Sequence, residues 1–561
     1  MRNRYKALVV ALAMLSVVAV PATSFADHDN RNSTDNMIAR GDSPFVALNP
    51  RGGAVTNSDL AFWGDLAING TYTGFRILDI SDPDNPTSLV DYEGCDGSQG
   101  DVMVWENLLI RTWDAPSPAD RFCGEHIVLV DEVPTEVPRP VTPGFEGLHV
   151  WDISDPTDPE FLSEFDMSNA AMQANYGVQG CGSHTATLVP LLDEGRLLIY
   201  NNHSGGSCNG IEVLEVNTDT GIIDFIRREG AGRSCHDTAV FLDDVMKAVC
   251  AGGNGFHVFS MGGPEGGTIE NPRSLHNIPV QDVSIGHTAA FTNDGKYFVF
   301  GHEPGGGGAA ECQDTDPERF YTFFMYDVAT GTLQGKWVLD IPQSALENCT
   351  LHNINFVPTT DGSDILVSGN YQAGTWVIDF TDHANPVTVG YADPPPLNPV
   401  AFSSGGAWST YWYNGFMYES EITKGFHVFE LDDAVVDNAM ELPYLNPQTT
   451  MQRVPEAFDV ESDVRTWYEP RPKQIKAEVN SEYTECEVGR EVAIRRIRAG
   501  KNPKTVAVKT TNGLGRVKLK NQWRGAKYFS VARTKQFTDQ FDNPGTCLAA
   551  KSGRVHVPRA R

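Results

Sequence analysis

Hydrophobic and polar residues alternate with a period of two along most of the chain. The stretch "GFRILDISDPDNPTSLVDY" from Gly74 shows the arrangement: an alternating segment, a turn rich in Asp, Pro and Asn, and a second alternating segment. Such alternation predicts half-buried β-strands, and Asp-Pro and Asn-Pro steps favour tight turns. The arrangement returns in "GLHVWDISDPTDPEFLSEF" from Gly147 and, less closely, in five further copies.

An apolar hairpin precedes these copies, as in "DLAFWGDLAINGTYT" from Asp59, so each repeating unit is expected to contain four short strands and no helix. Seven such units occupy roughly residues 58–433. A repeat of about fifty residues with four strands in each unit predicts a β-propeller, here with seven blades. Residues 36–42 ("NMIARGD") resemble the last strand of a unit, so we expect them to close the seventh blade.

The phrase "RILDISDPDNP" resembles the repeats of the LVIVD-repeat family, which are secreted bacterial proteins predicted to form β-propellers. The resemblance covers roughly residues 36–435 and is clearest in the first, second and sixth units. It implies a propeller that we assign to residues 27–440. It implies no particular activity.

The C-terminal part of the chain has a different character. A Pro- and Asn-rich passage, residues 441–474, is expected to be a linker. Residues 475–561 alternate again as short strands, with Cys486 near the start and Cys547 near the end, which predicts a small disulfide-closed β-sandwich. The expected fold class is therefore all-β, a seven-bladed β-propeller with a small C-terminal β-sandwich domain.

Charge also divides the chain. From Arg471 onward there are 21 Lys and Arg against 7 Asp and Glu, whereas the whole chain has 43 against 73. The preceding part is thus strongly acidic, with 22 against 66. An acidic body repels nucleic acid, which we exclude as a partner. The basic sandwich suits an anionic envelope surface, or the acidic body of the same chain.

The N-terminus predicts export. Arg2, Arg4 and Lys6 precede an apolar stretch over residues 7–20, and Ser24 and Ala26 supply small residues for cleavage. This is the pattern of a signal peptide, assigned to residues 1–26. No later stretch is long and apolar enough to predict a membrane span. The mature protein is expected to be secreted or to belong to the cell envelope.

Export makes the ten cysteines interpretable as disulfides. In a propeller blade, the connection into the first strand and the loop between the second and third strands lie on one face. The eight cysteines of the propeller occupy such places in pairs. This topology favours the pairs Cys95–Cys123, Cys181–Cys208, Cys235–Cys250 and Cys312–Cys349, with Cys486–Cys547 in the tail domain.

Four histidines head apolar stretches at equivalent places in the third to sixth units: His184, His236, His287 and His352. The equivalent residues elsewhere are Asp59, Asp101 and Trp408. These residues begin the innermost strands, which line the central channel, so the imidazoles are expected to converge at one end of it. Neutral imidazoles are ligands for transition metals such as Zn, Cu or Fe. The alternatives are a repeat residue that bonds the neighbouring blade and a pocket for a ligand without metal.

Two functions remain open. The leading prediction is a secreted binding or interaction protein whose disulfide-joined loop face contacts an extracellular ligand or protein. The alternative is a metal-dependent enzyme, such as an oxidoreductase, in which the four histidines hold the metal and Glu303, Asp101 or Asp237 orient the rings or transfer protons. No nucleophile motif or phosphate-binding loop assigns a catalytic residue. The candidate ligand-binding residues are Asp101, His203, His302, Glu303 and Trp408.

Overall fold

The computed structural model describes residues 32–45 and 56–558. Gaps in this description fall at residues 96, 98, 131–132, 192–193, 204–207, 230–231, 243–245, 451–457, 472, 482, 499–500, 521–525 and 539–543. The predicted signal peptide, residues 1–26, lies outside the described residues.

Antiparallel four-stranded units follow one another along the acidic part of the chain. The first three contain β3 (Asn57–Trp63), β4 (Leu66–Thr71), β5 (Gly74–Asp79) and β6 (Thr87–Tyr92); β7 (Val102–Trp105), β8 (Leu108–Trp113), β11 (Gly147–Asp152) and β12 (Glu160–Asp166); and β13 (Ala186–Leu191), β14 (Arg196–Asn201), β15 (Ile211–Val216) and β16 (Ile223–Glu229).

The next four sheets repeat this order. They contain β17 (Asp237–Phe241), β18 (Lys247–Gly252), β19 (Gly255–Ser260) and β20 (Arg273–Pro279); β21 (Gly286–Phe291), β22 (Tyr297–His302), β23 (Thr322–Asp327) and β24 (Leu333–Val338); β25 (Asn353–Phe356), β26 (Ile365–Gly369), β27 (Thr375–Asp379), β28 (Val387–Asp393) and β1 (Asn32–Ser33); and β29 (Ala407–Tyr413), β30 (Phe416–Glu421), β31 (Gly425–Leu431) and β2 (Met37–Pro44).

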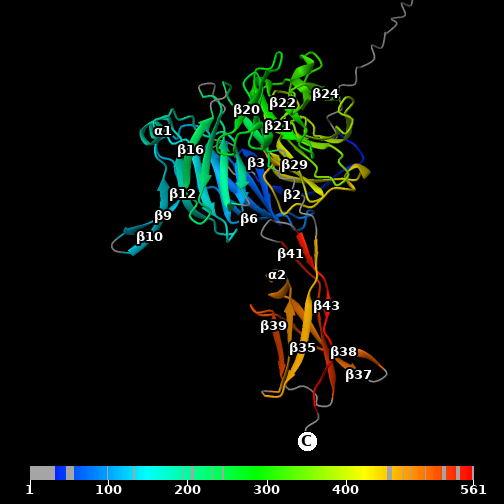
Figure 1. Ribbon diagram of the computed structural model, residues 1–561. Coiled ribbons are helices and arrows are strands. Elements are labelled where there is room, and N and C mark those ends of the chain that lie inside the picture. Colours follow the sequence, from blue (N-terminus) through cyan, green and yellow to red (C-terminus); the bar gives the residue numbers. More distant parts are fainter. Residues whose placement is uncertain are drawn as a thin grey trace, which may run out of the picture.

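The first strands of these sheets contact one another in a cycle. In order they are β3, β7, β13, β17, β21, β25 and β29, and β29 returns to contact β3. The cycle makes the fold all-β and propeller-like, as the repeat predicted (Figure 1). The first and last parts of the propeller-like body meet in the last sheet, because β2 pairs with β31 from Met37 opposite Leu431 to Pro44 opposite Gly425.

The repeated Asp-Pro phrase forms the third strand, a turn and the fourth strand of a sheet. In the first sheet the carboxylate of Asp79 accepts from the backbone N–H of Ser81 at 2.9 Å, and Asp82 accepts from that of Asp84 at 3.2 Å. Both carboxylates therefore hold the turn itself. Above the turn, Phe75 stacks on Tyr92 at 4.9 Å between ring centroids. This apolar face packs against the second sheet.

Two insertions depart from the expected pattern of strands alone. The helix α1 (Asn169–Tyr176) follows β12, where no helix was expected. It forms because the Ser168 side chain accepts from the N–H of Ala171 at its start, and Gly177 ends it with a φ of 70°. The hairpin of β9 (Phe122–Val130) and β10 (Val133–Pro140) projects from the second sheet (Figure 1). Short 3-10 turns lie at Gly263–Glu265, Pro304–Gly307, Glu318–Tyr321 and Ala434–Val436.

The start of the expected linker belongs to the propeller-like body. Within residues 441–474, β32 (Tyr444–Leu445) pairs with β3, and β33 (Thr449–Thr450) pairs in parallel with β17. Between them, Asn446 exchanges two hydrogen bonds of 2.9 Å with the backbone of Val104 in β7. The segment predicted as a linker thus begins with residues that pair with β3 and β17 and bond β7, because it crosses the first strands of these sheets.

The remaining strands form an elongated C-terminal part (Figure 1). Its sheets start before residue 475, with β34 (Phe458–Val460) and β35 (Asp463–Glu469). Buried residues of two sheets, including Ile475, Val492 and Tyr528, share one apolar cluster. The other elements are β36 (Gln474–Asn480), α2 (Thr484–Glu487), β37 (Glu491–Arg498), β38 (Lys501–Thr510), β39 (Arg516–Lys520), β40 (Lys527–Ala532), β41 (Lys535–Thr538), β42 (Pro544–Cys547), β43 (Ala550–Lys551) and β44 (Val555–His556).

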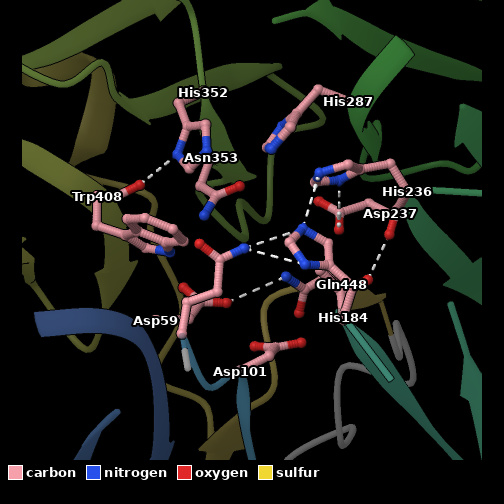
Figure 2. Close-up of a pocket in the computed structure, with 12 residues that line it drawn as sticks. Asp59, Asp101, His184, His236, Asp237, His287, His352, Asn353, Trp408 and Gln448 are labelled. Carbon is pink, nitrogen blue, oxygen red and sulfur yellow. Dashed lines mark hydrogen bonds and ion pairs between the residues drawn. The ribbon is translucent and has the colours of Figure 1, made fainter. Parts of the chain in front are cut away.

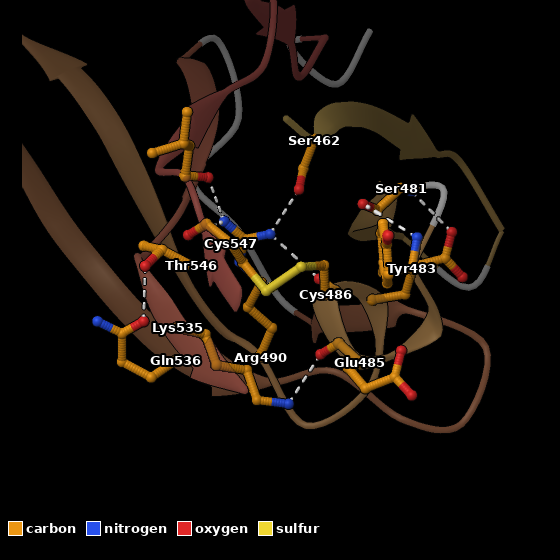
Figure 3. The surroundings of a disulfide bond; sticks show 12 residues. Ser462, Ser481, Tyr483, Glu485, Cys486, Arg490, Lys535, Gln536, Thr546 and Cys547 are labelled. Carbon is orange, nitrogen blue, oxygen red and sulfur yellow. Dashed lines mark hydrogen bonds between the residues drawn. A yellow bond between two sulfur atoms is a disulfide. The ribbon is translucent and has the colours of Figure 1, made fainter. Parts of the chain in front are cut away.

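Five disulfides cross-link the chain, as expected for ten paired cysteines. They join Cys95–Cys123, Cys181–Cys208, Cys235–Cys250, Cys312–Cys349 and Cys486–Cys547. Beside the last one, the buried guanidinium of Arg490 donates to Ser462 Oγ at 2.7 Å and to the carbonyls of Cys486 and Cys547 (Figure 3). Five disulfides indicate an oxidising compartment. In the part of the chain described, no helix has the length and apolar character needed to cross a membrane.

Candidate metal centre

The structure brings the four predicted histidines together at the starts of successive inner strands (Figure 2). His184 precedes β13, His236 precedes β17, His287 lies in β21 and His352 precedes β25. Neighbouring ring centroids are 4.4, 4.1 and 4.2 Å apart in this order. The four imidazoles, with the carboxylates of Asp237 and Glu303 that adjoin them, are called the channel cluster below.

The orientation of His184 is fixed by a carboxylate. Its Nδ1 lies 2.8 Å from Asp114 Oδ1, so Nδ1–H donates and Nε2 keeps its lone pair when the ring is neutral. This Nε2 lies 2.9 Å from His236 Nε2. The amide nitrogen of Gln99 also approaches the ring, at 3.0 Å from Nδ1 and 3.2 Å from Nε2. Asp114 thus fixes the position of His184 Nδ1, and His184 Nε2 faces the other imidazoles of the channel cluster.

His352 has an equivalent arrangement with a backbone group. Its Nδ1–H donates to the carbonyl of Trp408 at 2.6 Å, since a carbonyl oxygen only accepts. The Nε2 lone pair then faces Tyr371 Oη at 3.0 Å and Glu303 Oε1 at 3.5 Å. Tyr371 also donates to Glu303 Oε1 at 2.8 Å. Histidines that bind metals are typically oriented by such a bond from the other ring nitrogen.

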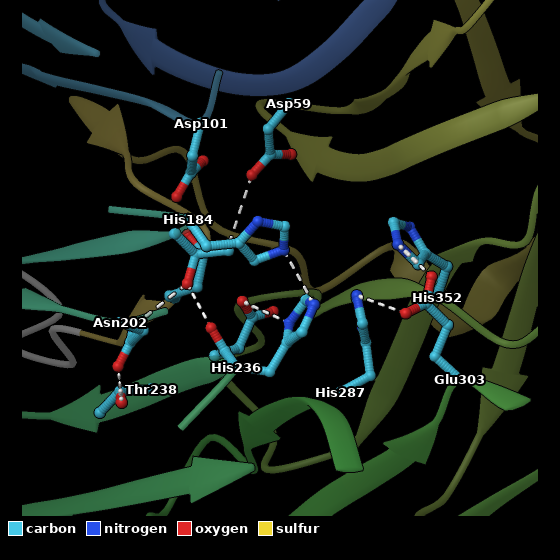
Figure 4. Close-up of polar contacts among 12 residues, drawn as sticks. Asp59, Asp101, His184, Asn202, His236, Thr238, His287, Glu303 and His352 are labelled. Carbon is cyan, nitrogen blue, oxygen red and sulfur yellow. Dashed lines mark hydrogen bonds and ion pairs between the residues drawn. The ribbon is translucent and has the colours of Figure 1, made fainter. Parts of the chain in front are cut away.

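Glu303 reaches a third ring as well, because its Oε2 lies 3.8 Å from His287 Nε2 (Figure 4). Space for this carboxylate depends on the glycine run after it. A Cβ at Gly307 would lie 2.1 Å from Tyr371 Oη and 2.8 Å from Glu303 Oε1. The absence of a side chain at Gly307 therefore makes room for Tyr371 and Glu303.

Burial and charge set the protonation of the cluster. Burial lowers the pKa of His287 well below its usual value, and the neighbouring His236 and His352 lower it further. Burial also lowers the pKa of His352, in spite of the nearby Glu303 charge. For His236, burial is outweighed by Asp237, Glu303 and Asp114, so its pKa is raised. His287 therefore stays neutral, which is the form that ligates metals.

A second layer of buried acids lies in the same pocket. Asp59, Asp101 and Asp237 are 3%, 6% and 2% exposed. Tyr411 donates to Asp59 Oδ1 at 2.7 Å, and Gln448, from the crossing segment between β32 and β33, donates to Oδ2 at 3.4 Å. Burial together with the charges of Asp59 and Asp237 raises the pKa of Asp101 well above its usual value.

The space among these groups is small. The pocket has a cavity volume of about 20 Å³. A cavity needs roughly 10–15 Å³ on this measure to hold one water molecule. The cluster can thus enclose an ion or water, whereas an organic ligand has to approach from outside the channel.

The other predicted ligand-binding residues divide into two groups. Asp101 and Trp408 line the pocket, and Glu303 contacts the cluster. His302 instead accepts from the backbone N–H of Ser284 at 3.2 Å, and neither it nor His203 lines the pocket. Sequence reasoning missed Tyr371, Gln99 and Gln448, which lie in loops where no repeated position marks them.

Two further groups of cysteine and histidine exist among the described residues. Cys95 and Cys123 lie beside His149, and Cys181 and Cys208 lie beside His203. In both groups the sulfur atoms are joined in disulfides. Since the thiolate is the metal ligand, these groups do not offer the sulfur donors of a metal site.

Comparisons with known proteins gave structural likenesses of low identity and no match in sequence. No protein-family model matches the chain, and no curated protein matches it in sequence. Similar solved structures include a putative 6-phosphogluconolactonase of Bacteroides fragilis (11% identity, 70% of this chain, 97% of that chain, TM-score 0.41). Others are the periplasmic gluconolactonase of Pseudomonas aeruginosa (11%, 70%, 96%, 0.42) and Sqt1 of Saccharomyces cerevisiae (10%, 71%, 100%, 0.41). Likenesses of this size carry no argument about what the chain binds or catalyses.

Proposed function

We propose that this protein is a metal-binding β-propeller that holds a transition metal in the channel cluster. The observation that carries the proposal is the convergence of four imidazoles from four successive sheets, with ring centroids 4.1–4.4 Å apart. Imidazole and carboxylate together suit Zn, Cu or Fe. This choice favours the alternative of a metal-dependent protein over a propeller that only binds through its loops.

The reading as plain repeat residues explains the cluster less well. A histidine that bonds the neighbouring blade satisfies both ring nitrogens or exposes one to water. In the channel cluster, His236 Nδ1 and His287 Nδ1 are buried without a hydrogen-bond partner. Leaving such groups unpaired costs about 1–3 kcal/mol each. Coordination of a metal ion removes this cost.

A ligand reaches the proposed metal from the loop face. The segment between β32 and β33 crosses the inner strands, and its Gln448 approaches Asp59 below the histidines. Disulfides hold several of the loops around the histidines; one of them is Cys312–Cys349, just before His352. The binding role of this face is therefore part of the proposal, and it concerns an extracellular molecule that contacts the metal.

The finer architecture is proposed on the same grounds. The cycle of inner strands supports a closed seven-bladed propeller, and the shared cluster around Ile475 supports a C-terminal β-sandwich. The strand–turn–strand phrase with Asp79 and Asp82 in the turn supports a place among LVIVD-repeat proteins. Export and contact of the basic sandwich with an anionic envelope surface complete the proposal. The disulfides support export, and the excess of Lys and Arg supports the contact.

Elemental analysis of the full secreted chain tests the proposal. The parent, after incubation with Zn²⁺, Cu²⁺ or Fe²⁺ and removal of free metal, is compared with a His236→Ala/His287→Ala variant. The matched control is His276→Ala/His383→Ala, because these histidines bond Ala329 and Asp364 outside the pocket. We expect bound metal in the parent and the control and none in the channel variant. Absence of metal from the parent with all three ions would overturn the proposal.

A further inference from the structure

The donor atoms of the channel cluster fall into two groups rather than one. Ligand atoms of His236, Asp237 and His287 lie within 4.8 Å of one another, and so do those of His287, Glu303 and His352. Among the described residues no such group contains all four imidazoles. Donors bound to one zinc ion at roughly 2.0–2.1 Å are at most about 4.2 Å apart. Each group can close on one ion with small movements, and His287 belongs to both.

The first group places two acceptors against each other. His184 Nδ1–H donates to Asp114, so its Nε2 accepts from His236 Nε2–H at 2.9 Å. The lone pair of a neutral His236 is then on Nδ1. This atom lies 3.5 Å from Asp237 Oδ1, and neither atom has a hydrogen-bond partner. A lone pair and a carboxylate oxygen repel each other in a buried place unless a proton or a metal ion lies between them, and a bound metal ion would take the place of that proton.

In the second group, too, a lone pair of an imidazole faces a carboxylate oxygen. His352 Nδ1–H donates to the Trp408 carbonyl, so the Nε2 lone pair faces Glu303 Oε1 at 3.5 Å. The single proton of Tyr371 Oη can bridge only one of these acceptors at a time. Glu303 Oε2 meanwhile faces His287 Nε2 at 3.8 Å.

His287 lies between the two groups (Figure 4). Its Nε2 is directed to the Glu303 group, and its Nδ1 is buried without a partner. An imidazole can offer one nitrogen to each of two metals once it has lost its proton. We propose that the channel cluster holds two transition-metal ions, one on each nitrogen of His287. Asp237 and His236 complete one site, and Glu303 and His352 complete the other.

This inference rests on the proposed metal binding and gives it a stoichiometry. His184 is then a positioning residue, since it acts on the first site through His236. His236, Asp237, His287 and His352 line the same small buried pocket, so a water molecule or small ion that enters it can contact both metal ions. Zn²⁺ and Cu²⁺ are the ions that imidazole and carboxylate donors favour here.

The test counts metal per chain and follows it by spectroscopy. The full chain is loaded with Cu²⁺ or Zn²⁺, freed of excess metal and analysed beside Asp237→Asn and Glu303→Gln. These variants keep side-chain volume and remove one carboxylate each. Asp364→Asn is the matched control, because Asp364 is a buried carboxylate that pairs with His383 outside the pocket. Circular dichroism checks that each variant is folded.

We expect two ions in the parent and the control and one in each channel variant. With Cu²⁺, an imidazolate between the ions couples their spins, so the parent's paramagnetic resonance signal is weaker than that of either variant per copper. One ion in the parent overturns the two-metal inference and leaves the proposed function standing. No ion overturns both. Two ions in the parent and in both variants overturn the assignment of the carboxylates.

Discussion

Two buried histidines of this protein, His149 and His287, have similar surroundings by simple measures, but only His287 belongs to the proposed metal site. Both are almost fully buried, and burial lowers the pKa of each, to about 4 for His149. Both lie beside groups that resemble metal ligands. His149 lies beside the sulfurs of a disulfide, with its Nε2 3.7 Å from Glu164 Oε2, whereas His287 lies beside two imidazoles and the Glu303 carboxylate.

The packing of the two rings differs in the same way. His149 stacks on Phe145 at 4.6 Å and meets three further aromatic rings edge-on, those of Trp113, Trp151 and Phe161. The neighbours of His287 are His236 and His352. Burial and a shifted pKa are therefore common to a core residue and to a residue of the proposed metal site. The kind of neighbour is what differs: a disulfide and aromatic rings surround His149, whereas imidazoles and a carboxylate converge on His287.

The largest expected difference between the two places is the response to metal. At a free Zn²⁺ concentration about 1,000 times Kd, binding to the folded state alone adds about 4 kcal/mol to the free energy of unfolding. We expect the urea concentration at the midpoint of unfolding to increase when Zn²⁺ is added to the metal-free parent. A chelator should return the midpoint to its original value. His236→Ala/His287→Ala should show no shift. If Zn²⁺ stabilised that variant as much as the parent, the metal would bind elsewhere, and His287 would not differ from His149 in its response to metal.

In the metal-free protein, alanine substitution should destabilise the fold more at His149 than at His287. His149→Ala leaves a void among four aromatic rings and is expected to cost about 3–4 kcal/mol, as for other buried rings. His287→Ala removes a ring that packs against polar imidazoles and not among aromatic rings, so its cost should be smaller, about 1–2 kcal/mol. Urea unfolding monitored by tryptophan fluorescence measures both. Equal costs would mean that His287 is as much a core residue as His149.

Acid should affect stability through His149. Its pKa falls from an unfolded value near 6.5 to about 4, so the unfolded chain binds the additional proton between these values. The free energy of unfolding therefore decreases as the pH falls from 6.5 to 4, by about 3 kcal/mol from this group. The neighbouring Glu164, whose pKa the adjacent His149 and Arg139 hold near 2 against the effect of burial, adds to the loss only at lower pH.

The variant His149→Phe keeps an apolar ring and cannot titrate. Metal-free parent and variant are compared by urea unfolding at several pH values between 4 and 7. The parent should show the larger decrease, and the difference between the two curves isolates His149. Parallel curves would contradict the assignment of the acid sensitivity to this residue.

The sequence predicted features that depend on local signals and missed those that depend on remote contacts. Strand–turn–strand phrases predicted the all-β, propeller-like fold, because alternation and Asp turns are local signals; Asp79 bonds a residue two positions away. The crossing segment was missed because its bonds are remote. Asn446 forms a hydrogen bond with Val104, which lies 342 positions earlier in the sequence, and no periodic pattern predicts such a contact.

Within the site, repetition decided what could be predicted. His184, His236, His287 and His352 recur at one place in successive units, so their convergence could be expected before the structure was known. Tyr371 occurs once, in a loop with a positive φ of 52°, and nothing in its sequence neighbourhood indicates contact with Glu303 and His352. Residues that orient a site from single loops are not identified by a repeat.

The smallest expected effect concerns the glycine run after Glu303. It distinguishes the steric effect of an added side chain on Tyr371 and Glu303 from the effect of backbone strain. Gly306 and Gly307 both have positive φ, 62° and 66°, so alanine at either position should cost about 1–2 kcal/mol. Only at Gly307 would the new Cβ meet Tyr371 and Glu303, since Gly306 has nothing within 4 Å. Gly307→Ala should therefore also weaken metal binding in the Glu303 group, measured by titration with Zn²⁺, whereas Gly306→Ala should not. If both variants bind Zn²⁺ as the parent does, Glu303 does not ligate the metal, and His287 is then distinguished from His149 by its imidazole neighbours alone.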